Sequence, residues 1–186
     1  MYSEPLSLIA SFFGMGFAMS SYFVKKKNLF FVWQGGAILF LALSCLFKLH
    51  FLPTLTYVIA LIRVVVYYLF EAHDKNVSIY LKTFFALLNV VAYFVLNAIS
   101  GASFNAIEVL LIVASIMYAY VFGIRNIKLM RFIFIIPTVM CIVYYILTCA
   151  AIFLIISYSF ELLANLTAIC YYKYMEIKFN KAKIKK

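Results

Sequence analysis

The chain alternates long apolar runs with short charged or turn-forming segments. A helix needs about 20 mainly apolar residues to cross the hydrocarbon core of a bilayer. Runs of about this length fall at 5–24, 28–47, 50–70, 81–98 and 106–124. The pattern therefore predicts an all-α membrane protein whose helices follow one another with short connections.

The last apolar stretch, residues 132–172, is about twice as long as one span requires. Its only charged residue is Glu161. A single helix of this length would overshoot the bilayer, so we expect two spans with a turn near Thr148–Ala151. Pro137 lies in the first of them and is expected to kink it. The full prediction is seven transmembrane helices.

Composition supports lipid as the solvent for most of the chain. Of the 186 residues, 68% are hydrophobic and only 12% are charged, and the mean hydropathy is +1.08. A soluble domain of this size could not bury so much apolar surface. The net charge of +10 resides in short clusters beside apolar runs. That pattern is typical of membrane orientation and argues against a nucleic-acid partner.

The positions of lysine and arginine predict the orientation in the membrane. Basic residues cluster at 25–27, 125–131 and 173–186. Such clusters favour the cytoplasmic side, so an even number of spans must separate them. Seven spans satisfy this requirement, with the N-terminus outside and the C-terminus in the cytoplasm of a cell with a cytoplasmic (inner) membrane. The basic tail 178–186 is expected to lie on anionic lipid.

A short internal similarity predicts a repeat. Tyr22–Asn28 and Tyr120–Asn126 each combine an aromatic exit, a basic turn and an asparagine. Spans 1–3 and 5–7 would share orientation if span 4 acts as a linker. The predicted organisation is a 3+1+3 parallel repeat of triple-helix bundles, as in some small-solute transporters. Its units are residues 1–79, the linker helix 80–104, residues 105–177 and the tail 178–186; chance similarity is the alternative.

The whole chain resembles the YgjV family of bacterial inner-membrane proteins. The similarity resides in the order of apolar and basic segments, in Ile59-Ala60-Leu61-Ile62-Arg63, and in Leu163-Ala164-Asn165-Leu166. That family implies no defined activity. The layout is also similar to PnuC-type vitamin transporters and SWEET sugar facilitators. The Pro-Gln pair of the PQ-loop relatives and the proline set of SWEETs are absent from this sequence.

Charged residues inside predicted spans are the strongest candidates for function, because each costs about 2.5–3.5 kcal/mol on insertion scales. Arg63 lies within span three, and Glu161 lies near the middle of span seven with Asn165 one helical turn later. We expect Arg63 and Glu161 to face each other in the interior as a pair. The pair would either line a solute path or bridge two bundles.

Three further polar residues join the predicted substrate pathway. Asn89 lies in span four, and Trp33 and Gln34 precede two glycines in span two. They could contact a flat solute ring or hold neighbouring helices together. Glu108 lies near the outer end of span five, where a carboxylate reaches water.

Chemical catalysis is not expected. The chain has two histidines, one aspartate and four cysteines, all four cysteines lying in apolar runs. These residues predict no metal set, no catalytic residues and no cofactor. The predicted function is a transporter or permease for a small polar solute; the alternative is a non-transporting scaffold or accessory subunit. A homo-oligomer is compatible with either.

Overall fold

The computed structural model describes residues 3–47, 51–100, 106–148 and 152–184. Within these ranges the chain forms seven helices and no strand. The helices are α1 (Ser3–Ser21), α2 (Lys27–Phe47), α3 (Phe51–Ala72), α4 (Ile79–Ser100), α5 (Glu108–Val121), α6 (Ile127–Leu147) and α7 (Ile152–Ile184).

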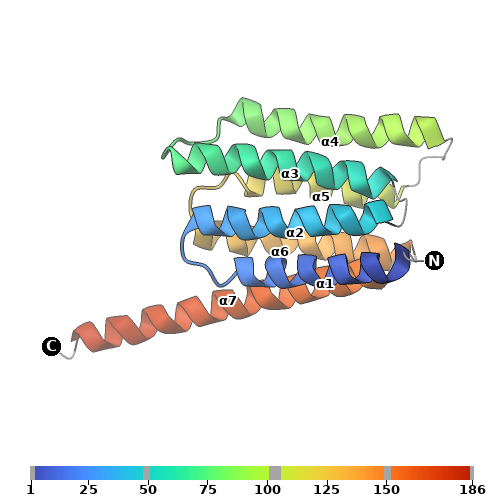
Figure 1. Cartoon of the computed structure of the whole chain (residues 1–186). Helices are drawn as coiled ribbons and strands as arrows, with labels where there is room; N and C mark the ends of the chain where they lie inside the picture. Colours follow the sequence, from blue (N-terminus) through green and yellow to red (C-terminus); the bar gives the residue numbers. More distant parts are fainter. Residues whose placement is uncertain (1–2, 48–50, 101–105, 149–151, 185–186) are drawn as a thin grey trace.

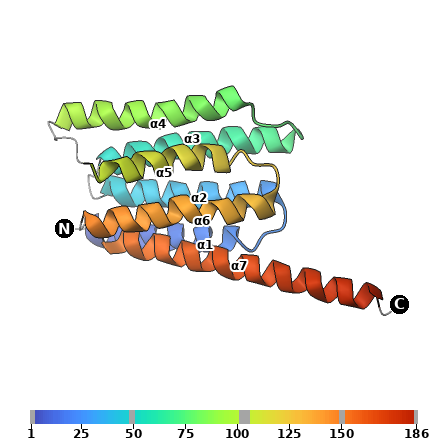
Figure 2. The same ribbon diagram turned by 180° about the vertical axis from the view of Figure 1, so that it is seen from behind.

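The helices form a closed ring in chain order. Each helix packs against the next, and α1 packs against α7. Opposite views show α1, α2 and α3 as one layer and α5, α6 and α7 as the other (Figures 1 and 2). Helix α4 lies along the edge formed by α3 and α5. The interior between the two layers therefore receives side chains from helices far apart in the sequence.

In the part of the chain that the structure describes, five helices are long and apolar enough to cross a membrane. They are α2, α6 and the segments Thr54–Ala72, Ile79–Ile99 and Ile152–Lys178 of α3, α4 and α7. Helix α5 is apolar but has 14 residues, about 21 Å at 1.5 Å per residue. Helix α1 carries several serines and two glycines, which lower its mean hydropathy. For the described residues the structure thus confirms an all-helical fold with five membrane-length helices, and seven spans stay a prediction.

The described helices match the predicted runs with two differences in length. The stretch 132–172 divides as expected: α6 ends at Leu147 and α7 begins at Ile152, with residues 149–151 outside the described part. The fifth helix is shorter than the predicted 106–124. Helix α7 continues to Ile184 and extends beyond the bundle (Figure 1). Pro137 lies within α6; a kink there stays a prediction.

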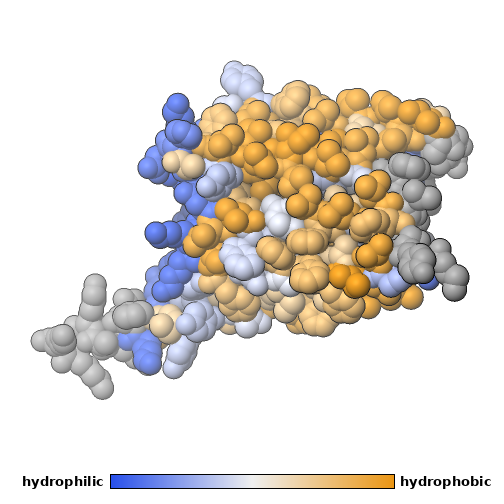
Figure 3. Space-filling view, viewed as in Figure 1, coloured by the Kyte–Doolittle hydropathy of each residue, from blue (hydrophilic) through white to orange (hydrophobic). Residues whose placement is uncertain are grey.

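The surface divides into an apolar side and a hydrophilic end. Large apolar side chains are exposed around the bundle, among them Phe12, Phe84, Phe132 and Leu163. Figure 3 shows hydrophilic residues gathered at the end that carries the α1–α2, α3–α4 and α5–α6 turns. We term this the basic end and the opposite one the far end. The basic turns meet at one end, which is the arrangement that the charge pattern requires.

Small residues bring α1 and α2 into close contact. A Cβ built on Gly36 would lie 2.5 Å from the Phe17 ring, and one on Gly14 would lie 3.2 Å from the Ala37 carbonyl oxygen. Near the far end, the Ser7 hydroxyl lies 2.9 Å from that of Ser44 on α2. Small residues and interhelical hydroxyl contacts are the usual means of joining helices in lipid.

The close contact between α1 and α2 predicts that two glycine substitutions differ in their effect on stability. Gly36→Ala should lower stability by about 1–3 kcal/mol, because the new methyl group overlaps the Phe17 ring. Gly16→Ala is the matched control, since no side chain beyond its chain neighbours and no neighbouring helix lies within 4 Å of its added Cβ. Thermal unfolding in detergent measures both variants; equal melting temperatures would contradict the close packing.

Two ion pairs at the basic end differ in burial. Lys27 at the start of α2 binds Glu71 near the end of α3 at 2.8 Å, with side-chain exposures of 6% and 22%. Lys128 on α6 and Glu176 on α7 are also 2.8 Å apart but are more than half exposed. The Lys27 ammonium also lies over the Phe31 ring. The Lys27–Glu71 pair therefore joins the end of α3 to the start of α2 at a site where water has little access.

We expect Glu71→Gln to lower stability by about 1–3 kcal/mol, because it leaves the buried Lys27 ammonium without its carboxylate. Glu176→Gln should change stability by less than about 1 kcal/mol, as for other exposed pairs. Unfolding curves of both variants in the same detergent test this ranking. An effect of Glu176→Gln as large as that of Glu71→Gln would contradict it.

Candidate functional site

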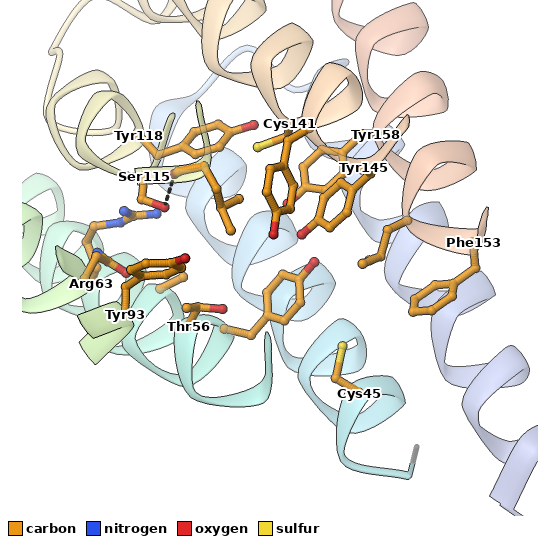
Figure 4. A pocket seen from close by; sticks show the side chains of 16 residues that line it. Cys45, Thr56, Arg63, Tyr93, Ser115, Tyr118, Cys141, Tyr145, Phe153 and Tyr158 are labelled. Carbon is orange, nitrogen blue, oxygen red and sulfur yellow. Dashed lines mark hydrogen bonds between the residues drawn. The ribbon is translucent and has the colours of Figure 1, made fainter. Parts of the chain in front are cut away.

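The interior holds a cavity of about 330 Å³ between the two layers. It receives side chains from every helix except α1 (Figure 4). Its lining includes Cys45 near the end of α2 and Phe153 at the start of α7. Because both positions belong to the far end, the cavity extends from the bundle centre toward that end.

Tyrosines dominate the lining of the larger cavity. They are Tyr57, Tyr93, Tyr118, Tyr144, Tyr145 and Tyr158. The rings of Tyr145 and Tyr158 stack with centroids 5.7 Å apart. Asn89 and Ser115 add polar groups, but each donates to its own helix, to the carbonyls of Phe85 and Leu111 respectively. The hydroxyls of Tyr57 and Tyr93, by contrast, are buried and have no hydrogen-bond partner among the described residues. The cavity therefore combines aromatic faces with a few unsatisfied polar groups.

Among the described residues, Arg63, near the middle of α3, is the only Lys, Arg, Asp or Glu in the lining of the larger cavity. Its side chain is 4% exposed and extends toward Ser115 in Figure 4. The guanidinium lies over the Phe122 ring at 5.0 Å. Among the described residues Arg63 forms no ion pair, and its Nε has no hydrogen-bond partner. A buried cation thus faces a cavity without a compensating anion.

A smaller cavity of about 90 Å³ adjoins the larger one. The two share five lining residues, namely Tyr57, Ala60, Arg63, Tyr118 and Tyr158. Gln34 from α2 and Glu161 from α7 line only the smaller cavity. One carboxylate oxygen of Glu161 accepts a hydrogen bond from the Tyr22 hydroxyl at 2.8 Å and one from the Gln34 amide at 3.3 Å. Glu161 is therefore already held by neutral donors.

The prediction of a direct Arg63–Glu161 pair is wrong. The ion pairs of the described residues are Lys27–Glu71, Arg125–Asp74 and Lys128–Glu176. Glu161 finds its partners in Tyr22 and Gln34 instead. Both charged residues do lie in the interior, as expected, because both line the smaller cavity. The two residues come from different helices, α3 and α7, and form no direct ion pair.

Aromatic packing closes the smaller cavity toward the basic end. Tyr22, Phe30, Phe122 and Phe134 form an inner aromatic cluster with ring centroids 5.3–5.9 Å apart, and each is at most 2% exposed. Phe122 and Phe134 also line the smaller cavity. The interior is therefore hollow toward the far end and sealed toward the basic end.

The predicted site residues separate into two groups. Arg63, Gln34, Glu161 and Asn89 line the two central cavities. Asn165 lines neither; it is buried and donates to the Arg131 carbonyl, joining α7 to α6.

Trp33 also lies away from the central cavities. It lines a hollow on the outer face of α1 and α2, where its ring centroid lies 5.2 Å from that of Phe17. Glu108, at the start of α5, accepts a hydrogen bond from the Asn97 amide at 3.4 Å.

The sequence analysis missed the tyrosine lining. Helical spacing carries a signal for it: Leu111, Ser115 and Tyr118 follow at intervals of four and three, and so do Leu154, Tyr158 and Glu161. Each set lies on one helix face. Tyrosines are frequent throughout this chain. Their number alone therefore does not show which of them line a cavity and which lie at the membrane interface.

The donor set of the described residues does not point to metal chemistry. Within those ranges no group of three or more His, Cys, Asp or Glu side chains lies close enough to hold a metal ion. No protein-family model, curated protein or solved structure matches the chain. The two cavities and their charges are therefore the basis for a functional proposal.

Proposed function

We propose that this chain is a seven-span permease of a bacterial inner membrane for a small polar solute. The observation that supports it most is Arg63, a buried and unpaired cation shared by two adjoining cavities at the centre of the bundle. An ionisable group at membrane depth is costly and usually faces a substrate pathway. Membership of the YgjV family stays a prediction.

The arrangement of layers supports the 3+1+3 repeat. Rotating α1–α2–α3 by half a turn about an axis along the helices would place these helices near α5–α6–α7 with the same direction (Figures 1 and 2). Helix α4 supplies the extra crossing that keeps both triplets parallel. The cavities lie between the triplets, where transporters built from repeats hold their substrates.

The orientation follows from the basic end. With that end in the cytoplasm, the larger cavity extends toward the outside, and the inner aromatic cluster separates the site from the cytoplasm. Helix α7 would carry the basic tail past the membrane to anionic lipid. A cytoplasm-active reporter fused after Lys186 should give signal; signal only from a periplasm-active reporter would reject this orientation.

The transport cycle requires the two ends to open in turn. A solute entering from the outside would reach Arg63 through the larger cavity and stop at the inner aromatic cluster. Phe122 touches both the guanidinium and the cluster. Movement of the α5–α6 turn that carries Phe122 away from Phe30 would therefore alter the site and open the inner side together.

Uptake into liposomes containing the purified protein tests the proposal. Radiolabelled small solutes of anionic, cationic and neutral classes are offered to wild-type vesicles, Arg63→Gln vesicles and vesicles without protein. We expect protein-dependent uptake of one class and its loss in Arg63→Gln. Uptake equal to that of empty vesicles for every class, with a folded protein, would favour the scaffold alternative.

A further inference from the structure

We propose that the larger cavity binds a small organic carboxylate, with the carboxylate on Arg63 and its apolar body among the tyrosines. This inference rests on the proposed function, because it names the class of solute that the permease would take. Charge, lining and the state of Glu161 each contribute to it.

The lack of a direct ionic partner for Arg63 among the described residues favours an anion as the ligand. The contact of Arg63 with the Phe122 ring compensates only part of the loss of hydration, because a cation–π contact is weaker than a hydrogen-bonded ion pair. The described residues provide no carboxylate within ion-pair distance of the guanidinium. A guanidinium binds a carboxylate through two parallel hydrogen bonds, which makes this ligand class the natural counterion.

The lining favours an organic rather than an inorganic anion. Arg63 shares the lining with Tyr93, Tyr118 and Tyr158, together with Leu111 and other apolar side chains. The volume of about 330 Å³ lies near the lower end of the range of small-molecule sites, roughly 300–1,000 Å³. Aromatic faces bind flat apolar groups well, whereas a hydrated inorganic ion would leave most of the cavity unfilled.

Glu161 argues against a second charge on the ligand. An amino acid would need an anionic partner for its ammonium group. The Glu161 carboxylate instead accepts from Tyr22 and Gln34 and does not line the larger cavity. A ligand with one negative charge therefore fits the described contacts better than a zwitterion.

Ring-matched probes test the ligand class with the purified full chain in detergent. Benzoate, benzyl alcohol and benzylamine share a ring and differ in charge. Equilibrium dialysis and thermal shift should show benzoate binding at least tenfold more tightly than the other two. Arg63→Gln should lose this preference, and Arg63→Lys should retain part of it because the charge remains. Trp33→Phe is the matched control, since Trp33 lies on the outer face of the bundle, and should bind benzoate as the wild type does.

Equal binding of the three probes, or unchanged benzoate binding in Arg63→Gln, would overturn the inference. So would phenylalanine or chloride binding more tightly than benzoate. If Arg63→Gln does not fold, the probe series on the wild type and Arg63→Lys decides. Arg63-dependent benzoate binding by a protein that moves no solute would retain this inference and reject transport. Solute uptake that depends neither on the charge of the solute nor on Arg63 would retain transport and reject this inference.

Discussion

Arg63→Met should abolish solute binding and uptake while making the protein more stable. The substitution removes a buried guanidinium that has no anionic partner among the described residues and replaces it with an apolar side chain. Replacing buried ion pairs by well-packed apolar side chains can stabilise a protein by about 1–4 kcal/mol, and we expect a gain of similar order here because no ion pair offsets the lost hydration of Arg63. Loss of a charge-assisted contact to the ligand should cost about 2–5 kcal/mol of binding. Thermal unfolding and uptake by the same preparation measure both effects.

Arg131→Met is the matched control for Arg63→Met. Arg131 is equally buried, but it donates to the Val24 carbonyl oxygen and lies over the Tyr172 ring at 4.7 Å. It therefore joins α6 to the α1–α2 turn and to α7, and its loss should lower stability. If Arg63→Met were the less stable of the two and kept its uptake, Arg63 would be a structural residue and the account of the site would fail.

Tyr22→Phe should be the most damaging removal of a single hydroxyl group. Tyr22 is fully buried and donates to the Glu161 carboxylate at 2.8 Å, and bonds to charged groups contribute about 1.5–3 kcal/mol. Its loss leaves the Gln34 amide, at 3.3 Å, as the one remaining donor to that carboxylate oxygen among the described residues. We expect a stability loss of about that size, measured by thermal unfolding, because Glu161 and the inner aromatic cluster both depend on Tyr22.

Tyr120→Phe provides the comparison for Tyr22→Phe. Tyr120 holds the equivalent place in the predicted repeat, and its hydroxyl lies 2.9 Å from the neutral Thr83 hydroxyl. A neutral bond is worth about 0.5–1.5 kcal/mol, so this variant should lose less stability. Equal losses would show that the Tyr22–Glu161 bond has no special strength.

The sequence predicted the helices well because apolar run length is a strong signal. Each predicted run begins or ends close to an observed helix, and the break in 132–172 follows from length alone. The short length of α5 was not predicted. The residues of the run 106–124 that lie outside Glu108–Val121 are mostly apolar too, so hydropathy alone does not show where the helix begins and ends. The course of α7 to Ile184 also escaped prediction, because a charged segment carries no membrane signal.

The site was predicted only in part, for a physical reason. Arg63 and Glu161 were selected because isolated charges in apolar runs are conspicuous. Their partners were not predictable, because the relative rotation of α3 and α7 decides which groups they meet. The Tyr22 hydroxyl and the Gln34 amide donate to Glu161. The ion pair between Arg63 and Glu161 that the sequence suggests therefore does not form. Asn165 likewise reaches the Arg131 carbonyl rather than a cavity.

Charge-dependent labelling of a cysteine measures most directly whether water reaches the cavity beside Arg63 and whether this cavity selects anions. Cys141 lines that cavity and is buried. In a variant whose other three cysteines are replaced by serine, Cys141 is exposed from the outer side to methanethiosulfonates that differ only in charge. We expect the anionic reagent to react about tenfold faster than the cationic one, and the ratio to fall toward one in Arg63→Gln. Failure of both reagents to react, or a ratio unchanged by Arg63→Gln, would contradict an anion-selective solute path.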